Sequence, residues 1–128
     1  MPLILQHRIF PQDLKNNPKI YYIFGDNEMR KGFGGQARTC RGKVNAIGIA
    51  TKIAPSMSEG SFWSDDDYDR CTKIIDKDLK LVKELLSQGR IVIYPSDGIG
   101  TGLSALPERC PKIYQYLVQQ INFLKENY

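Results

Sequence analysis

Two short apolar runs in this 128-residue chain each end in a cluster of glycines, and this repeated pattern constrains the fold more than any other feature. The first run, IYYIF (20–24), leads into GDNEMRKGFGGQA (25–37), and the second, IVIYP (91–95), leads into SDGIGTG (96–102). Runs of β-branched and aromatic residues that stop at glycine are typical of buried strands. We therefore expect two strands that each open into a glycine-rich loop.

Two further segments have the composition of strands. LILQHRIF (3–10) is a candidate for a first, edge-like strand, followed by a polar connection, PQDLKNNPK (11–19). VNAIGIAT (44–51) is another candidate, and its small residues would let a neighbouring element approach closely. Together with the two runs above, the chain is expected to contain four strands.

Two helices are expected in the second half of the chain. The first covers about 65–88, where Ser64 can act as the N-cap and Asp67 can complete a capping box. Its apolar stripe consists of Ile74, Ile75, Leu79, Val82, Leu85 and Leu86. The last helix is expected to start near Pro107 or Pro111. Its apolar face consists of Ile113, Leu117, Ile121 and Leu124.

Strands that alternate with helices predict an α/β fold, and the length fits one domain over residues 1–128. We expect a mostly parallel, mixed sheet flanked by helices in a three-layer arrangement. Sheets of this kind bind ligands in a crevice beyond the carboxyl ends of their strands. Both glycine clusters lie at such ends, so this edge is where we expect a functional site.

Composition limits the classes of function. The formal net charge of +4 comes from scattered basic residues, which suits a small anionic ligand and lacks the basic runs with interleaved aromatics of a single-strand nucleic-acid platform. Three widely spaced cysteines without histidine partners (Cys40, Cys71, Cys110) predict neither a zinc site nor a disulfide framework. With no signal-like start and no apolar run of membrane length, the expected location is the cytoplasm. A homo-oligomer is left open.

The first glycine cluster can hold an anion. Three glycines leave room for backbone N–H groups to converge on a phosphate, namely Gly32, Gly34 and Gly35. Gln36 and Ala37 would open a helix whose first N–H groups add to the same pocket, while Arg30 and Lys31 would supply charge at its rim. The spacing matches neither a P-loop nor the dinucleotide-binding fingerprint. A loop that serves only as a tight turn remains an alternative.

The second glycine cluster repeats the arrangement. Glycines alternate with Ile99 and Thr101, which would expose several N–H groups in a row; they are Gly98, Gly100 and Gly102. A single loop of this kind is weak evidence for a site. Two such loops at the ends of neighbouring strands would form two walls of one crevice, which favours a phosphate-containing ligand.

These two segments resemble the loops of the macro domain. Gly25-Asp26-Asn27 followed by residues 32–37 resembles the first loop of that family, and residues 98–102 resemble the second, with its Ile-Gly-Thr-Gly core. The chain is most similar to short macro-like proteins of phages and bacteria, in which GDN…GGQA, NAIGI.TK and DG.GTGL..LP occur together. The resemblance extends from Tyr21 to Leu117.

The resemblance implies a reduced macro-like fold and an ADP-ribose-type ligand. Asn27 would bond a ribose hydroxyl, and the two glycine loops would hold the diphosphate and the distal ribose. The early acidic residue with which the family reads adenine has no counterpart in this sequence, so the base is left open.

Three charged residues at strand ends are candidates for the site. Asp26 and Asp97 directly follow the first and second apolar runs, so each could orient a water for attack or bond a ribose hydroxyl. Alternatively, each only caps N–H groups in a turn. Lys52 closes another expected strand and would neutralise a phosphate, or it would be an ordinary solvated lysine.

Aromatic residues offer candidates for stacking on a base. Phe33 lies inside the first glycine loop and is the better candidate. Phe62 and Trp63 could form a lid over a base. Trp63 and Tyr68, however, have the spacing of a hydrophobic staple around the N-cap Ser64, which favours a structural role for Trp63. His7 is the only histidine and is expected to be structural or exposed.

From these features we expect a protein that binds an ADP-ribose-like or other phosphate-containing nucleotide, and that sequesters a nucleotide signal as a phage counter-defence protein would. The alternative is a hydrolase that acts on an ADP-ribose derivative with Asp26 or Asp97 positioning water; nucleic-acid binding is a weaker one. No cofactor or metal is expected. The expected ligand-binding residues are Gly25, Asp26, Asn27, Gly32, Phe33, Gly34, Gly35, Gln36, Lys52, Asp97, Gly98, Ile99, Gly100, Thr101 and Gly102.

Overall fold

Four strands form one sheet in the computed structural model of the protein, which describes residues 3–128. The strands are β1 (Leu3–Gln6), β2 (Tyr21–Asn27), β3 (Ala46–Lys52) and β4 (Val92–Pro95), in the spatial order β1-β4-β2-β3. All three pairings are parallel, which confirms the predicted α/β class. Because the strands are parallel, their carboxyl ends meet at one edge of the sheet.

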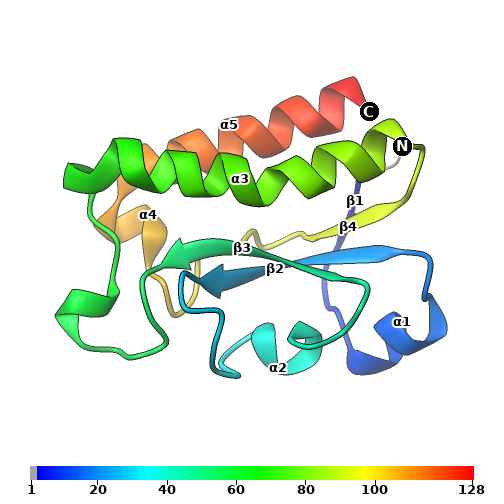
Figure 1. Ribbon diagram of the computed structural model, residues 1–128, viewed down its shortest axis with the longest axis horizontal. Coiled ribbons are helices and arrows are strands. Elements are labelled where there is room, and N and C mark those ends of the chain that lie inside the picture. Colours follow the sequence, from blue (N-terminus) through cyan, green and yellow to red (C-terminus); the bar gives the residue numbers. More distant parts are fainter. Residues whose placement is uncertain (1–2) are drawn as a thin grey trace.

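Helices cover both faces of the sheet, which gives three layers (Figure 1). The long helices α3 (Tyr68–Ser87) and α5 (Pro111–Asn127) lie on one face. The short helices α1 (Pro11–Asn16) and α2 (Ala37–Cys40) lie on the other. A third short helix, α4 (Leu106–Arg109), lies close to the carboxyl end of β3.

Side chains alternate along β2 between two hydrophobic cores, as a strand buried on both faces requires. Ile23 belongs to the core under α3 and α5, and its neighbours Tyr22 and Phe24 belong to the smaller core against α1 and α2. Both cores are well buried; Ile23 is fully enclosed. The sheet is therefore fixed from both sides, and its carboxyl edge is a rigid base for the loops that follow.

The helix expected over 65–88 begins differently from the prediction. A three-residue 3₁₀ turn, η2 (Asp65–Asp67), precedes α3. Ser64 Oγ accepts from the N–H of Asp66 at 3.2 Å, while the Asp67 carboxylate lies 3.8 Å from Arg70. The predicted capping box is wrong, because the tighter 3₁₀ turn brings the nearer N–H to Ser64. Of the predicted apolar stripe, all but Ile74 is buried, and Ile74 packs against the core.

A helix forms where the sequence was read as a polar connection over 11–19. Pro11 is the first residue of α1, a position that suits its fixed φ and missing N–H. The Asp13 carboxylate accepts from the N–H of Phe10 at 2.8 Å. The connection prediction is wrong at this point because helix-start signals outweigh the polar composition.

The end of the chain holds two helices, since α4 starts one residue before Pro107 and α5 starts at Pro111. The buried residues of α5 are the predicted ones, Ile113, Leu117, Ile121 and Leu124. None of the helices in the described part of the chain combines the length and apolar character that crossing a bilayer requires.

Candidate functional site

A cavity of about 280 Å³ lies at the carboxyl edge of the sheet, where the two glycine-rich segments meet. We call residues 28–36, which follow β2, loop 1, and residues 96–105, which follow β4, loop 2. The loops touch each other: a Cβ on Gly34 would lie only 2.6 Å from the Leu103 side chain. The predicted crevice with one loop on either side is therefore present.

Most residues predicted for the site line this cavity. Phe33 does not; its side chain is largely exposed, away from the lining. Those that line the cavity are Gly25, Asp26, Asn27, Gly32, Gly34, Gly35, Gln36, Lys52, Asp97, Gly98, Ile99, Gly100, Thr101 and Gly102.

The loops present runs of backbone donors with no acceptor in the protein. Within residues 3–128, the N–H groups of 32–36 and of 100–104 donate no hydrogen bond. Successive unpaired N–H groups around a concave wall are the usual way in which backbone binds an anion. Helix α2 has only four residues, so its dipole adds little to this field.

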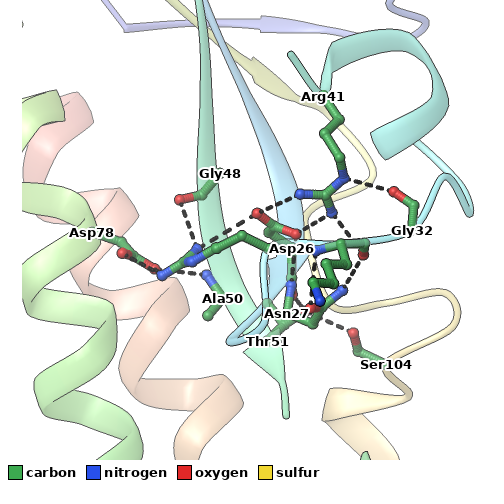
Figure 2. A network of polar contacts seen from close by, with 11 residues as sticks. Asp26, Asn27, Gly32, Arg41, Gly48, Ala50, Thr51, Asp78 and Ser104 are labelled. Atoms are coloured by element: carbon green, nitrogen blue, oxygen red, sulfur yellow. Dashed lines mark hydrogen bonds and ion pairs between the residues drawn. The ribbon is translucent and has the colours of Figure 1, made fainter. Parts of the chain in front are cut away.

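Asp26 and Arg41 form a buried ion pair beside the cavity (Figure 2). The carboxylate projects from β2 and the guanidinium comes from the residue after α2. Arg41 also donates from Nε to the carbonyl of Gly32 at 2.6 Å and from Nη2 to the carbonyl of Lys31 at 3.0 Å. One arginine thus ties the strand end to loop 1.

A second arginine approaches Asp26 from the other side. Arg30 Nη1 lies 3.6 Å from Asp26 Oδ2, and Arg30 Nη2 donates to both oxygens of Asp78 on α3, at 2.8 and 2.9 Å. Asp78 also accepts from the N–H of Ala50 at the edge of the sheet, at 2.8 Å. Asp26 is therefore enclosed between two guanidinium groups, and Arg30 pairs with α3 where the sequence predicted a rim charge.

Asn27 uses its side chain to hold the turn into loop 1. Its Nδ2 donates to the carbonyl of Lys31 at 2.8 Å, and its Oδ1 accepts from the N–H of the same residue at 3.5 Å. On the floor of the cavity, the hydroxyls of Thr51 and Ser104 lie 2.6 Å apart and connect β3 with loop 2. These contacts fix the geometry of both loops without a ligand.

Lys52 lies in the cavity wall and is 5% exposed. Its Nζ donates to the carbonyl of Ser56 at 2.8 Å and lies 4.3 Å from the ring centroid of Phe62. Burial lowers the pKa of Lys52, and the nearby Arg109 guanidinium lowers the pKa further. No acidic side chain of the described residues lies within 4.0 Å of this amine, so an anion in the cavity would be its first ionic partner.

His7 and Asp97 meet in the lining of the same cavity. His7 follows β1 and Asp97 follows β4, and these strands are neighbours in the sheet. His7 Nδ1 lies 4.0 Å from Asp97 Oδ1, and both side chains are about three-quarters exposed, at 76% and 77%. The cavity lining thus includes one lysine without an acidic partner and an exposed imidazole–carboxylate pair.

Gln36 contributes an unusual acceptor to the wall. Its Oε1 is buried and has no hydrogen-bond partner among the described residues. Most buried polar atoms are satisfied, and an unsatisfied one needs a reason. A donor on a bound molecule, such as a hydroxyl, would satisfy it.

Several wall residues were missed by sequence reasoning. His7 was expected to lie apart from the motifs, yet strand order brings it to the cavity. Arg41, Thr51 and Ser104 carry no local signal, since their partners are 15 to 53 positions away along the chain. The alternative of a Trp63 lid is wrong, because Trp63 is buried in the main core and donates to Glu28.

The fold and the cavity define a class: a small α/β protein with a parallel sheet and a polar crevice between two glycine-rich loops at its carboxyl edge. The chain belongs to the family described as "Family of unknown function (DUF7831)", whose model matches residues 4–120. No curated protein and no solved structure is significantly similar to it. Within residues 3–128, no three histidine, cysteine, aspartate or glutamate side chains gather as a metal site would require.

Proposed function

We propose that the protein binds a phosphate-containing nucleotide of the ADP-ribose type in the crevice between loops 1 and 2. The observation that carries this proposal is the pair of unpaired N–H runs, 32–36 and 100–104, in two loops that border one cavity. Phosphate oxygens accept several hydrogen bonds at once, so they match such a wall better than a neutral ligand does.

The charges around the cavity support an anionic ligand. Lys31 and Lys52 line the wall, and the Lys52 amine has no acidic partner. Two acidic residues also line it: Asp26 is already paired with Arg41, and Asp97 lies in loop 2 beside His7. The field near loop 1 is therefore positive, and an anion there would be stabilised by charge as well as by the N–H groups.

The nucleotide part of the proposal rests on the macro-domain resemblance and on the cavity. About 280 Å³ is close to the lower end of small-molecule sites, at roughly 300 Å³. A diphosphate with one sugar fills such a space, which leaves the base at the mouth. Holding without reaction would suffice to sequester a nucleotide signal, which is the role we propose for a phage or bacterial cell.

Isothermal calorimetry tests this proposal directly. The wild-type protein is titrated with ADP-ribose, its phosphorylated and cyclic forms, cyclic dinucleotides and inorganic phosphate. We expect micromolar affinity for at least one nucleotide and weak affinity for phosphate alone. The absence of heat with every compound would refute nucleotide binding. A single-stranded oligonucleotide is included, since tight binding that falls steeply with salt would instead favour a nucleic-acid ligand.

A lysine pair provides the matched control. Lys52→Met should weaken binding at least about tenfold, because it removes a positive charge that has no acidic partner from a residue of the wall. Lys80→Met changes an exposed lysine of α3 outside the cavity and should leave the affinity unchanged. Equal effects of the two substitutions would show that only the overall charge matters.

A second function, hydrolysis of an ADP-ribose derivative, is favoured by the imidazole–carboxylate pair. With Asp26 held by arginines, Asp97 is the carboxylate left to orient a water, and His7 beside it can accept or return a proton. Chromatography of the ligand recovered from the complex separates the two functions. Intact ligand supports binding alone, whereas a product that disappears in Asp97→Asn supports hydrolysis.

The Lys52 amine offers a different route to the same hydrolysis. Burial and the nearby Arg109 guanidinium lower the pKa of Lys52, which favours the neutral, nucleophilic form of the amine. Its Nζ would form a bond to the anomeric carbon of a ribose and lose a proton while the bond to the leaving group breaks. Opening of the ribose ring, with cleavage of the bond from that carbon to the ring oxygen, would then give an imine, and water would hydrolyse the imine to release the sugar and restore the amine. Cyanoborohydride would trap that imine as a mass increase on the Lys52 peptide. If the ligand is cleaved without a trapped adduct, the water mechanism is favoured.

A further inference from the structure

Arg41 lines the cavity, yet the hydrogen bonds of its guanidinium go to the protein. It makes four: two to the Asp26 carboxylate and one each to the carbonyls of Lys31 and Gly32. All three guanidinium nitrogens are engaged, and the side chain is 15% exposed. An arginine used in this way has little left to offer an anion directly.

The two carbonyl contacts set the direction of the peptides in loop 1. In a trans peptide the C=O and the following N–H point in opposite directions. When Arg41 holds the carbonyls of Lys31 and Gly32, it turns the N–H groups of Gly32 and Phe33 away from itself. These N–H groups begin the unpaired run 32–36. Arg41 therefore orients the start of that run, together with Asn27 Nδ2, which also donates to the carbonyl of Lys31.

The position of Asp26 in turn depends on the lack of a side chain at Gly48, on the neighbouring strand β3. A Cβ on Gly48 of β3 would lie 2.6 Å from Asp26 Oδ2 and 3.1 Å from Asp26 Cβ. Figure 2 shows Asp26 between Gly48 on one side and Arg41 on the other. Because residue 48 is glycine, this space is open, and the Asp26 carboxylate can occupy it and face Arg41.

We propose that Arg41, held by Asp26 in the space over Gly48, is a positioning residue that sets loop 1 in its binding arrangement without contacting the ligand. The proposal rests on the proposed function, because it explains how the crevice is kept ready for an anion. Preorganisation of this kind raises affinity by removing the cost of ordering the loop at the moment of binding.

The first experiment compares Arg41→Lys with Arg41→Met in a titration with ADP-ribose. A positioning role needs the planar fork, so both variants should lose at least about tenfold in affinity. A direct contact with the ligand's charge would be largely preserved by lysine, and that result would overturn the proposal. Arg38→Lys, an exposed arginine of α2 outside the cavity, is the control and should bind normally.

The salt dependence of affinity gives a readout that a direct ligand contact would change. The double variant Asp26→Asn/Arg41→Met removes the ion pair without changing the net charge. If Arg41 does not touch the anion, this variant should weaken binding while leaving the slope of log affinity against log salt unchanged. Lys52→Met should reduce that slope, because it removes a positive charge from a residue of the cavity wall. A reduced slope in the double variant would overturn the positioning role.

Gly48→Ala tests this arrangement by filling the space beside Asp26 from β3, which is not part of loop 1. It should displace Asp26, weaken ADP-ribose binding like Arg41→Met, and speed amide hydrogen exchange in the ligand-free protein at Ala37 and Arg38, whose N–H groups donate to the loop 1 carbonyls of Gly34 and Gly35. Gly60→Ala, where a Cβ meets nothing within 4 Å, is the matched control. Unchanged exchange in both Gly48→Ala and Arg41→Lys would overturn the proposal.

The exchange measurement needs no ligand, so it separates two failures. If wild type binds no nucleotide but Arg41→Lys still speeds exchange at Ala37 and Arg38, the proposed function fails while the positioning role stands. If wild type binds and the variants neither loosen the loop nor lose affinity, the positioning role fails alone.

Discussion

Loops 1 and 2 border the same cavity but are held in different ways. Loop 1 depends on side-chain charges: Arg41, paired with Asp26, holds two of its carbonyls. Loop 2 depends on its own backbone, with hydrogen bonds from Gly98 to Pro95, from Ala105 to Gly102 and from Leu106 to Gly100. Ile99 anchors it in the main core.

This difference predicts which kind of substitution disrupts each loop. A change in charge should release loop 1 and leave loop 2 intact, whereas a change in volume should damage loop 2 and the helix that follows it. Gly100 lies against Leu106 and Thr51, while Gly35 of loop 1 has nothing within 4 Å of its Cβ position. Variants of each type therefore test whether the two walls are independent.

The largest effect is expected for Asp26→Asn. It leaves Arg41 without its carboxylate in a mostly buried position, and breaking a buried ion pair in this way costs about 3 kcal/mol of unfolding free energy. Urea denaturation measures the loss. Asp97→Asn is the control, because its exposed carboxylate should change stability by no more than about 0.5 kcal/mol. Similar losses of unfolding free energy in both variants would mean that the Asp26–Arg41 ion pair does not stabilise the fold.

Gly100→Ala should come next, with a loss of about 2 kcal/mol, and Gly35→Ala should lose about 1 kcal/mol. Both glycines have positive φ, at 75° and 55°, so the backbone strain of an alanine is shared. The difference reports the crowding at Gly100, where a Cβ would lie 3.0 to 3.2 Å from Leu106 and Thr51. Equal losses in urea denaturation would show that loop 2 is no better packed than loop 1.

The different surroundings of the two glycines also matter for binding tests. From the glycine pattern alone, a bulky residue at either position is expected to abolish binding and leave the fold largely intact. The structure keeps that expectation for Gly35, which faces open space, but not for Gly100, which packs on α4. A glycine pattern indicates backbone freedom, and it does not reveal which glycines are also packed.

A pH titration of binding tests whether Lys52 belongs to the anion wall. Burial lowers the pKa of Lys52 in the free protein, and an anionic ligand would raise that pKa, so binding takes up a proton between the two values. Affinity should then fall by at most about tenfold per pH unit as pH rises above the free pKa. Calorimetry in buffers of different ionisation enthalpy measures the uptake.

Lys52→Arg is the matched variant for that titration, because arginine keeps the charge and does not titrate in this range. Its affinity should be independent of pH where that of wild type falls. If wild type and variant share the same pH profile, another group is responsible and Lys52 does not face the ligand.

Much of the fold could be predicted from the sequence, because local signals and burial agree along most of the chain. The stripe of α5 and three of the strands follow from apolar periodicity. Helix α1 was missed because its polar composition hid the start signal at Pro11 and Asp13. The length of β2 was underestimated because a glycine looked like its end, whereas the strand continues to Asn27.

The site was predictable only where its parts are continuous in sequence. The two loops were found because glycines cluster. Arg41 was not, because its partner lies across α2 and only the folded chain joins them. The distance of His7 from the motifs along the chain predicts a structural or exposed residue, whereas the pairing of β1 with β4 places it beside Asp97. Side-chain ties between distant segments have no local signal, and they are what holds loop 1.

The smallest effect is expected in the reaction rates of two buried cysteines, which lie in the segments that follow loops 1 and 2. Cys40 ends α2 beside loop 1, and Cys110 joins α4 to α5 beyond loop 2. Burial raises the pKa of each thiol to about 11, so both react slowly with iodoacetamide at pH 8 and any difference in rate reports local opening.

Asp26→Asn should therefore speed alkylation of Cys40 by a few-fold and leave Cys110 nearly unchanged, while Gly100→Ala should do the reverse. Mass spectrometry of the two cysteine peptides, at urea concentrations far below the unfolding transition, measures both rates in one sample. Equal acceleration at both cysteines in either variant would mean that the loops open only when the whole domain unfolds. In that case the two walls of the crevice would form one cooperative unit, and the distinction between a charge-held and a backbone-held loop would describe their contacts but not their stability.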